Sequence, residues 1–183
     1  MKYMFASDLH GSAYYTEKVV RRFEEEKPEK LILLGDYLYH GARNDPPEKY
    51  GPKAVTPLLN SLKERIIGVR GNCDSEIDQA VLEFPMLADY AMMYVDGHDW
   101  FITHGDHFNE HEMPPHTEGT VLIHGHTHLK ITEKYDDFYY VNPGSASIPK
   151  DDDLHSYMTY ENGIFTIRDL EDGRPLKSLS LDD

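Results

Sequence analysis

Cysteine is nearly absent from this chain, and its scarcity excludes two kinds of stabilising site. The single cysteine, Cys73, can form neither an internal disulfide nor a zinc site built from several thiolates. A chain of 183 residues can bury a core without such cross-links, so we expect one domain spanning residues 1–183. The cysteine content also fits a reducing compartment.

Long hydrophobic runs are missing as well. Segments such as Leu31 to Leu34 and Val121 to Ile123 are typical of the longest, whereas a membrane-spanning helix needs roughly 20 apolar residues. The N-terminal segment reaches Asp8 too soon to contain the apolar region of a signal peptide. These absences predict a cytoplasmic protein without a membrane partner.

Basic residues are scarce relative to acidic ones. The chain has 18 Lys and Arg residues against 33 Asp and Glu residues, and its formal net charge is −15 at pH 7. This charge repels polyanions at long range, so we expect neither polymeric nucleic acid nor an anionic membrane as a partner. A phosphate-containing substrate would need a local positive centre, which bound metal ions would supply.

The first half of the chain alternates short apolar segments with helical patterns. Lys2 to Ala6, Leu31 to Leu34 and Ile66 to Val69 are predicted to be buried strands. Apolar spacing predicts helices over residues 12–27 and from Pro52 to about Glu64. This order predicts parallel strands joined by right-handed crossovers.

Short strands dominate the second half. Asp96-Gly97 and Asn162-Gly163 each separate two short β-type segments, which is a signature of β-hairpins. We therefore predict hairpins over residues 90–103 and 156–169. The combined pattern predicts an α/β fold with two stacked, largely β layers and helices outside.

Five short stretches place metal-binding side chains directly after apolar runs. In chain order they are Asp8-Leu9-His10-Gly11, Gly35-Asp36, Gly71-Asn72-Cys73-Asp74, and Thr103-His104-Gly105 followed by Gly125-His126-Thr127-His128. Ligands collect at the carboxyl ends of strands, and the neighbouring glycines permit tight turns over the sheet edge. Carboxylate, imidazole and amide donors suit a catalytic site for Mn, Fe, Ni or Zn.

The spacing of these residues indicates two metal ions. Asp8 and His10 are two residues apart, as are His126 and His128, so in an extended chain each pair would face one centre. Asp36 is alone in its stretch and is the natural bridging carboxylate. Two metals about 3.5–4 Å apart would position a hydroxide for in-line attack on phosphorus. The predicted ligands are Asp8, His10, Asp36, Asn72, His104, His126 and His128.

These blocks and their order resemble the calcineurin-like metallophosphoesterase superfamily. The resemblance extends from Asp8 to about Pro149, and is strongest to its YfcE-like branch of small bacterial phosphodiesterases. The branch features are Gly71-Asn72-Cys73-Asp74-Ser75-Glu76 and His40-Gly41-x-Arg43-Asn44. The resemblance implies a four-layer α-β-β-α sandwich, the metallo-dependent phosphatase fold, in which helices flank two mixed sheets.

The resemblance also implies how the two metals are held. The first metal would take Asp8, His10, Asp36 and His128, and the second would take Asp36, Asn72, His104 and His126. The expected ions are divalent, with Mn²⁺ preferred and Zn²⁺, Ni²⁺ or Fe as alternatives.

Two positions depart from the family pattern. In many relatives a histidine follows the Gly-Asn pair, where it protonates the leaving group or contacts phosphate, and here that residue is Cys73. A thiol has a reference pKa of about 8.5 and forms weak hydrogen bonds, so we expect a preference for phosphodiesters with good leaving groups. The other departure is Asp106, which either orients His104 or faces solvent.

Further residues near the motifs are candidates for catalysis or substrate binding. Cys73 and Asp74 are the candidate catalytic residues. Arg43 and Asn44 lie in the long loop after Asp36 and are candidates for substrate binding, because an arginine can bind phosphate oxygens bidentately. Solvated loop charge is the alternative for these two. His124 is assigned a structural or rim position.

The sequence therefore predicts a dinuclear-metal-dependent phosphodiesterase that hydrolyses small phosphodiesters by attack of a metal-bound hydroxide. A phosphomonoesterase with the same centre is the nearest alternative, although the missing histidine after Asn72 argues against it. Some relatives use the fold as a protein-interaction scaffold with an incomplete ligand set, whereas this chain keeps every ligand. The 13 tyrosines would support a homodimer or higher homo-oligomer, or equally a packed core.

Overall fold

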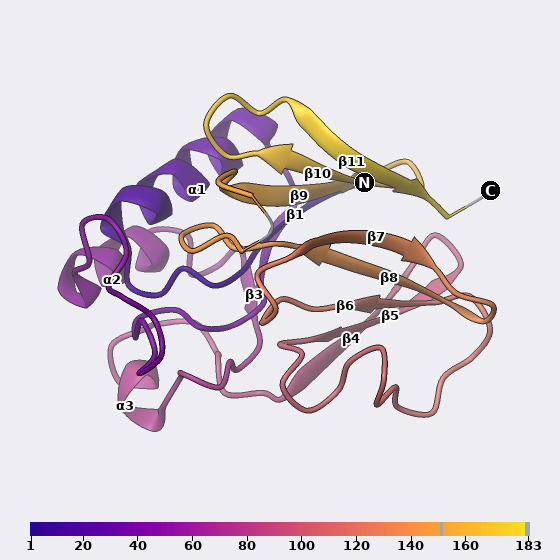
Figure 1. The fold of residues 1–183 in the computed structure, drawn as a ribbon, viewed down its shortest axis with the longest axis horizontal. Helices are drawn as coiled ribbons and strands as arrows, with labels where there is room; N and C mark the ends of the chain where they lie inside the picture. Colours follow the sequence, from indigo (N-terminus) through magenta and orange to yellow (C-terminus); the bar gives the residue numbers. More distant parts are fainter. Residues whose placement is uncertain (151, 182–183) are drawn as a thin grey trace.

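The computed structural model, which describes residues 1–150 and 152–181, contains two β-sheets packed face to face (Figure 1). One sheet comprises β1 (Lys2–Ala6), β2 (Lys30–Leu33), β3 (Ile66–Gly68), β9 (Ser156–Glu161), β10 (Ile164–Asp169) and β11 (Pro175–Ser180). The other comprises β4 (Tyr90–Val95), β5 (His98–Thr103), β6 (Thr120–Ile123), β7 (Lys130–Lys134) and β8 (Phe138–Pro143). The helices are α1 (Ala13–Glu26), α2 (Pro52–Asn60) and α3 (Glu76–Gln79). Within the described ranges, no helix is both long and apolar enough to cross a membrane.

Both sheets mix parallel and antiparallel neighbours. The first sheet has the order β11-β10-β9-β1-β2-β3, and the second has the order β4-β5-β6-β8-β7. Strands β1, β2 and β3 are parallel, as are β5, β6 and β8, and the remaining pairs are antiparallel. The predicted fold class, an α/β arrangement of two mixed sheets with helices outside, is confirmed.

The first half of the chain follows the predicted strand and helix pattern, with one difference. The Ser12 side chain caps α1 by accepting a hydrogen bond from the N–H of Tyr15 at 3.2 Å. Helix α2 ends at Asn60 rather than near Glu64. Beyond Asn60 the backbone forms i to i+3 turns, as in the 3.2 Å bond from the Lys63 N–H to the Asn60 carbonyl, which replace helical bonds.

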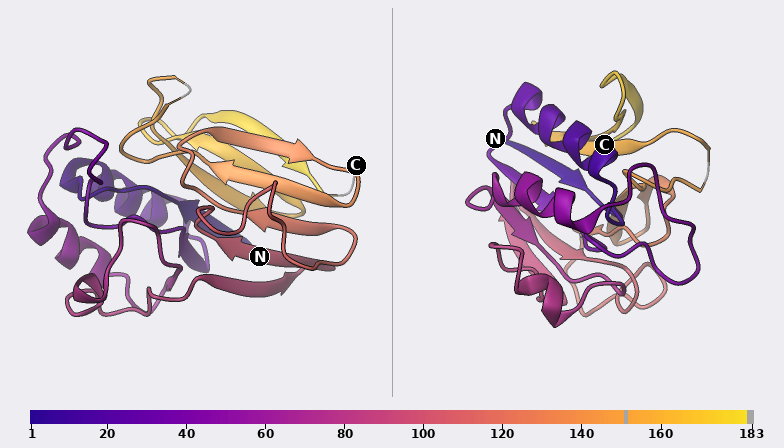
Figure 2. Two further views of the ribbon diagram at one scale, coloured as in Figure 1. Left: turned by 60° about the horizontal axis from the view of Figure 1, so that its bottom comes forward. Right: turned by 90° about the vertical axis from the view of Figure 1, so that its left-hand side faces the viewer.

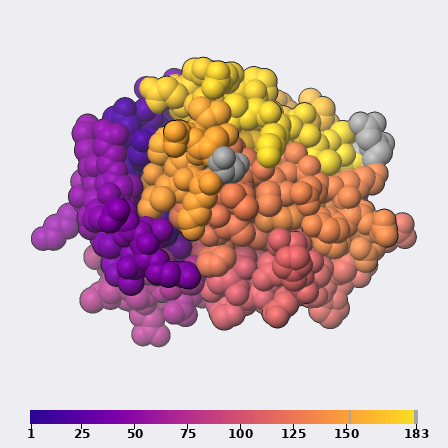
Figure 3. Space-filling model, viewed as in Figure 1, coloured from indigo at the N-terminus to yellow at the C-terminus, as the bar shows by residue number. Residues whose placement is uncertain are grey.

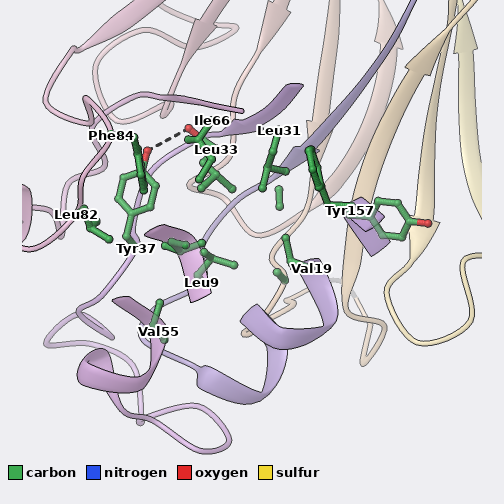
Figure 4. Close-up of a cluster of buried hydrophobic side chains, with 14 of the residues drawn as sticks. Leu9, Val19, Leu31, Leu33, Tyr37, Val55, Ile66, Leu82, Phe84 and Tyr157 are labelled. Atoms are coloured by element: carbon green, nitrogen blue, oxygen red, sulfur yellow. Dashed lines mark hydrogen bonds between the residues drawn. The ribbon is translucent and has the colours of Figure 1, made fainter. Parts of the chain in front are cut away.

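Alternation along β1 divides the buried core in two. Met4 faces the helices, while Tyr3 faces the second sheet. On the helix side, Val19 of α1 and Val55 of α2 pack in one cluster with Leu31 of β2 (Figure 4). The parallel strands are therefore covered on both faces, which holds their carboxyl ends in fixed relative positions.

The outer face of the second sheet is covered by a loop instead of a helix (Figure 2, left). Residues 104–119 contain no helix, and Phe108 and Met113 from this loop pack against Phe101 of the sheet. Pro114 and Pro115 lack backbone N–H donors, which disfavours a continuous helix here. This loop therefore forms the outermost layer on this side of the second sheet.

The two predicted hairpins are present. β4 pairs with β5 and β9 pairs with β10, both antiparallel. In the turns, Asp96 and Gly97 have φ values of 48° and 89°, and Asn162 and Gly163 have values of 52° and 80°. Positive φ at both central residues is the geometry that favours Asn-Gly and Asp-Gly in tight hairpins.

Candidate metal centre

The predicted metal ligands leave the two sheets at the carboxyl ends of their parallel strands. In the first sheet, predicted ligands follow strands β1, β2 and β3. In the second sheet, they follow strands β5 and β6. In chain order these residues are Asp8 with His10, Asp36, Asn72, His104, and His126 with His128. The contacts described below connect all seven residues, so side chains far apart in the chain converge on one site.

Asp8, His10 and His128 form one group of donors. Asp8 Oδ1 lies 3.3 Å from His128 Nε2 and 3.6 Å from His10 Nε2, and the two Nε2 atoms are 3.2 Å apart. Asp8 Oδ1 is buried and has no hydrogen-bond partner among the described residues. A buried carboxylate oxygen without a donor, facing two imidazole nitrogens, fits a divalent cation.

Asp36 connects this group to a second one. Asp36 Oδ2 lies 3.6 Å from His10 Nε2 and 3.4 Å from His104 Nε2. His104 Nε2 is also 3.0 Å from Asn72 Oδ1 and 3.2 Å from His126 Nδ1. Asp36 therefore lies between two sets of donors, which is the position that a bridging carboxylate would occupy.

Backbone carbonyls orient three of the imidazoles. The pairs are His10 Nδ1 with the Tyr39 carbonyl at 2.9 Å, His104 Nδ1 with that of Leu34 at 2.6 Å, and His128 Nδ1 with that of Ile148 at 2.5 Å. A ring that donates its proton through Nδ1 directs the Nε2 lone pair toward the centre. The three rings are thus held in the tautomer that can bind a metal.

Five of the seven predicted ligands have a left-handed backbone conformation. Their φ values are 57° at Asp8, 46° at His10, 58° at Asp36, 64° at His126 and 62° at His128. Non-glycine residues rarely adopt this conformation, and such strain concentrates at functional sites. The prediction that Asp8 and His10, and likewise His126 and His128, face one centre from an extended chain was therefore wrong. Turns direct these side chains inward.

Close approach of the backbone explains two of the neighbouring glycines. A Cβ atom at Gly71 would lie 2.2 Å from Asp36 Oδ1, and one at Gly125 would lie 1.9 Å from Ser7 Oγ. Both distances are too short for any side chain. Glycine at these positions lets the loops carrying the predicted ligands pack against one another.

Carboxylates and imidazoles in the site shift one another's protonation. Burial alone would raise the pKa of Asp8, but the adjacent imidazoles of His10 and His128 hold this pKa well below its ordinary value. Burial likewise opposes the charged form of His104, yet hydrogen bonding with Asp36 and the charge of nearby Asp8 raise its pKa to about 10. Burial and the neighbouring His104 lower the pKa of His126. The buried carboxylates therefore attract positive charge, which divalent cations would supply in place of protons.

Asp74 is buried next to the site, and its carboxylate is hydrogen-bonded to the backbone. Its side chain accepts hydrogen bonds from the backbone N–H groups of Asp36 and Tyr37, both at 2.8 Å, and of Gly71 at 2.7 Å. The residue is 3% exposed, and burial together with Asp36 raises its pKa to about 7. These contacts join the chain after β2 to the chain after β3, so they favour a positioning function over the catalytic function predicted for Asp74.

Cys73 lines the site next to Asp36. Its N–H donates to Asp36 Oδ1 at 2.8 Å, and its sulfur lies within 4.8 Å of donor atoms of His10 and Asp36. Burial, and then the charge of Asp36, raise the pKa of the thiol to about 12. Cys73 is thus a neutral, weakly donating group at the edge of the centre.

A cavity of about 830 Å³ opens over these groups. Arg43 and Asn44 both line it, as expected for candidates in substrate binding, although the Asn44 side chain donates to the His40 carbonyl at 2.9 Å. Tyr39 and Lys150 also line the cavity and were not predicted. Tyr39 adjoins the His40-Gly41 motif, which is a usable signal, whereas Lys150 belongs to no motif.

Asp106 and His124 lie on the second-sheet side of the centre. Asp106 lines a smaller hollow of about 230 Å³, and its Oδ2 lies 3.5 Å from His107 Nε2. Among the described residues, it forms no hydrogen bond or ion pair with His104. His124 is buried, lies 3.2 Å from a Glu110 carboxylate oxygen and stacks on Tyr140 with ring centroids 4.6 Å apart. The buried contacts of His124 agree with the structural position assigned to it.

The chain matches known proteins over most of its length. Residues 1–162 match the family model for the calcineurin-like phosphoesterase superfamily domain. The chain is 42% identical over 172 residues to phosphodiesterase YfcE of Escherichia coli strain K12, with 94% of each chain covered. It is 28% identical over 153 residues to phosphodiesterase MJ0936 of Methanocaldococcus jannaschii, covering 80% of this chain and 84% of that protein.

Solved structures agree with the sequence matches. The structure of YfcE, a phosphoesterase from E. coli, superposes with a TM-score of 0.96 at 40% identity, covering 99% of this chain and all of that one. Vps29 from Entamoeba histolytica, complexed with zinc, gives a TM-score of 0.63 at 18% identity over 99% of both chains, which shows a shared fold. The resemblance predicted from the motifs is thus confirmed, and the chain belongs to the calcineurin-like phosphoesterase superfamily.

Proposed function

We propose that this protein is a dinuclear-metal-dependent phosphodiesterase that acts on small molecules. The observation that carries the proposal is the convergence of carboxylate, imidazole and amide donors on both sides of Asp36. Its 42% identity to a protein named as a phosphodiesterase supports the choice of diester over monoester. A neutral thiol at Cys73, in place of an imidazole, supports the same choice.

The first metal would be held by Asp8, His10, Asp36 and His128, and the second by Asp36, Asn72, His104 and His126. When bound, the two ions supply Lewis acidity toward the phosphate oxygens and lower the pKa of water. Mn²⁺ is the proposed ion, because carboxylate donors and the oxygens of water and phosphate suit it. Zn²⁺, Ni²⁺ and Fe are the alternatives for the same donors.

The residues of the chain would orient the substrate and keep the donors in place. Arg43 and Asn44 would bind the ester at the wall of the cavity, and Cys73 would face the leaving group as a weak proton donor. Asp74 would act as a positioning residue, through its three bonds to backbone N–H groups. Poor leaving groups, which need protonation, would then react slowly.

The remaining expectations concern the whole protein. We propose one domain over residues 1–183, acting in the cytoplasm on a small molecule, without polymeric nucleic acid or a membrane as partner. The net charge of −15 supports the exclusion of polyanions. A homodimer or higher homo-oligomer could use edge strand β4, where Tyr90, Met92 and Tyr94 are exposed.

The test is hydrolysis of bis(p-nitrophenyl) phosphate and p-nitrophenyl phosphate by metal-stripped protein, with and without Mn²⁺. We expect metal-dependent cleavage that strongly favours the diester. An Asp36→Asn variant should lose this activity, whereas the exposed Asp137→Asn should retain it. Preference for the monoester would instead indicate a phosphomonoesterase, and inactivity of folded protein with every divalent ion would favour the scaffold function.

A further inference from the structure

We propose that the substrate is a phosphodiester in which one esterified alcohol carries a second anionic group, bound by Arg43 and Lys150. This inference rests on the proposed function and narrows its substrate class. The second group would be a carboxylate or a phosphate, since each of these groups has several negatively charged oxygens that a cationic side chain can bind.

The two cations come from separate loops that border the same cavity. Arg43 belongs to the loop between β2 and α2, and Lys150 to the loop between β8 and β9. These two loops are neighbours in both views of Figure 2 and adjoin on the face shown in Figure 3. Neither side chain forms a hydrogen bond or ion pair with any residue that the structure describes.

The carboxylates of the cavity have other partners. Two carboxylates, Asp36 and Asp74, line it within the described part of the chain. Asp36 lies among the imidazoles, and Asp74 accepts three backbone hydrogen bonds. Asp152, close to Lys150 in sequence, contacts Lys130 Nζ at 2.7 Å. Arg43 and Lys150 therefore keep their charge available to a ligand.

The cavity is large enough to hold more than the reacting phosphate. Its volume of about 830 Å³ is within the usual range for small-molecule sites and far exceeds that of one phosphate group. The remaining space can accommodate an ester substituent. Tyr39, 43% exposed and lining the same cavity, offers apolar surface to the carbon part of that substituent.

Charge supports the same assignment. In a protein of net charge −15, two cations without a partner among the described residues, beside two bound metal ions, would create a local positive region that attracts anions. The two metal ions already suffice for the single charge of a simple diester. Arg43 and Lys150 would then bind a second negative group on the substrate.

The test compares p-nitrophenyl ethyl phosphate with its 2-carboxyethyl and 2-phosphonoethyl counterparts, which share one leaving group. With Mn²⁺-loaded protein, we expect kcat/KM to be roughly tenfold higher for at least one charged ester, as partly exposed charge-assisted hydrogen bonds allow. The charged ester with the higher kcat/KM identifies which anionic group is bound. Arg43→Gln and Lys150→Met should each reduce this preference, while Lys53→Met, an exposed lysine outside the cavity, should preserve it.

Two results would overturn the inference and leave the proposed function intact. One is hydrolysis of the ethyl ester at the same kcat/KM as both charged esters. The other is an equal loss on all three esters in Arg43→Gln and Lys150→Met, which would show that these cations bind the transferred phosphate. If no ester is hydrolysed, the proposed function fails, and calorimetric binding of the three corresponding non-hydrolysable phosphonates decides the inference, since equal affinities would overturn it.

Discussion

Asp36 is the residue on which both halves of the proposed centre depend. Its Oδ2 faces His10 on one side and His104 on the other, while its Oδ1 accepts the Cys73 N–H at 2.8 Å. Its own N–H donates to Asp74. Three residues thus hold one carboxylate in place, which limits how far either metal position could shift independently of the other.

At the scale of single residues, the prediction concerns Cys73. Replacing Cys73 with His should raise hydrolysis of poor leaving groups relative to good ones, because imidazole is a far better proton donor than a neutral thiol near neutral pH. The measurement is the ratio of kcat/KM for aryl phosphodiesters of high and low leaving-group pKa. We expect an increase of about ten- to a hundredfold in the relative rate with the poor leaving group.

Cys73→Ser is the matched control, because a hydroxyl is similar in size and is also a neutral, weak acid. It should leave the ratio near the wild-type value. An unchanged ratio in Cys73→His would show that this position does not assist the leaving group.

At the scale of elements, the loop over residues 104–119 covers the outer face of the second sheet. It begins at His104, a predicted ligand, and Glu110 in its middle contacts buried His124 at 3.2 Å. His124 in turn lies two residues before His126. This contact therefore joins the loop to the segments that carry two predicted ligands.

The ionised form of Glu110 should stabilise this loop in a pH-dependent way. Hydrogen bonding with His124 lowers the pKa of Glu110 to about 2, compared with about 4.3 in an unfolded chain. A carboxylate with a depressed folded pKa contributes stability above its unfolded pKa and loses it as the pH falls through the folded value. Glu110→Gln should therefore lower the free energy of unfolding at pH 7 by roughly 1 kcal/mol.

Urea unfolding of wild type and Glu110→Gln at several pH values measures this difference. It should shrink as the pH falls from about 4.3 toward about 2, where the wild-type carboxylate also becomes protonated. Glu112→Gln, an exposed residue of the same loop, is the control and should be nearly neutral. A difference that stays constant with pH would contradict the assignment.

For the whole molecule, the main expectation is that metal binding stabilises the fold. The donors come from both sheets, so an ion bound among them would bind the folded chain in preference to the unfolded one. At a free ion concentration of 100 times Kd, this linkage is worth about 2.7 kcal/mol per site. Adding Mn²⁺ to metal-stripped protein should raise Tm, and a chelator should reverse the change.

Asp8→Asn separates specific binding from general attraction to an acidic protein. Asp8 is buried among His10 and His128, whereas Asp172 is exposed, so Asp8→Asn should lose much of the Tm shift and Asp172→Asn should keep it. The scans need equal ionic strength, because a net charge of −15 responds to salt. An equal Tm shift in both variants would point to non-specific cation binding.

Local features of the sequence were sufficient for much of the fold. The hairpin turns followed from Asp96-Gly97 and Asn162-Gly163, because tolerance of positive φ is a property of those residues themselves. Strands β1, β2 and β3 and helix α1 followed from their apolar patterns, which reflect burial on one or both faces. Helix α2 was predicted too long, since its end depends on turn contacts after Asn60 that periodicity does not register.

The identity and order of the site residues were likewise readable in the chain, because each donor type and its neighbouring glycine are local properties. Their conformation was not, and left-handed φ values at Asp8 and His10 replaced the extended backbone that their spacing suggested. Only the tertiary structure placed Lys150 in the cavity, tied Asp74 to three backbone amides and laid the loop over the second sheet. These features depend on contacts between segments far apart in sequence, and no local preference encodes such contacts.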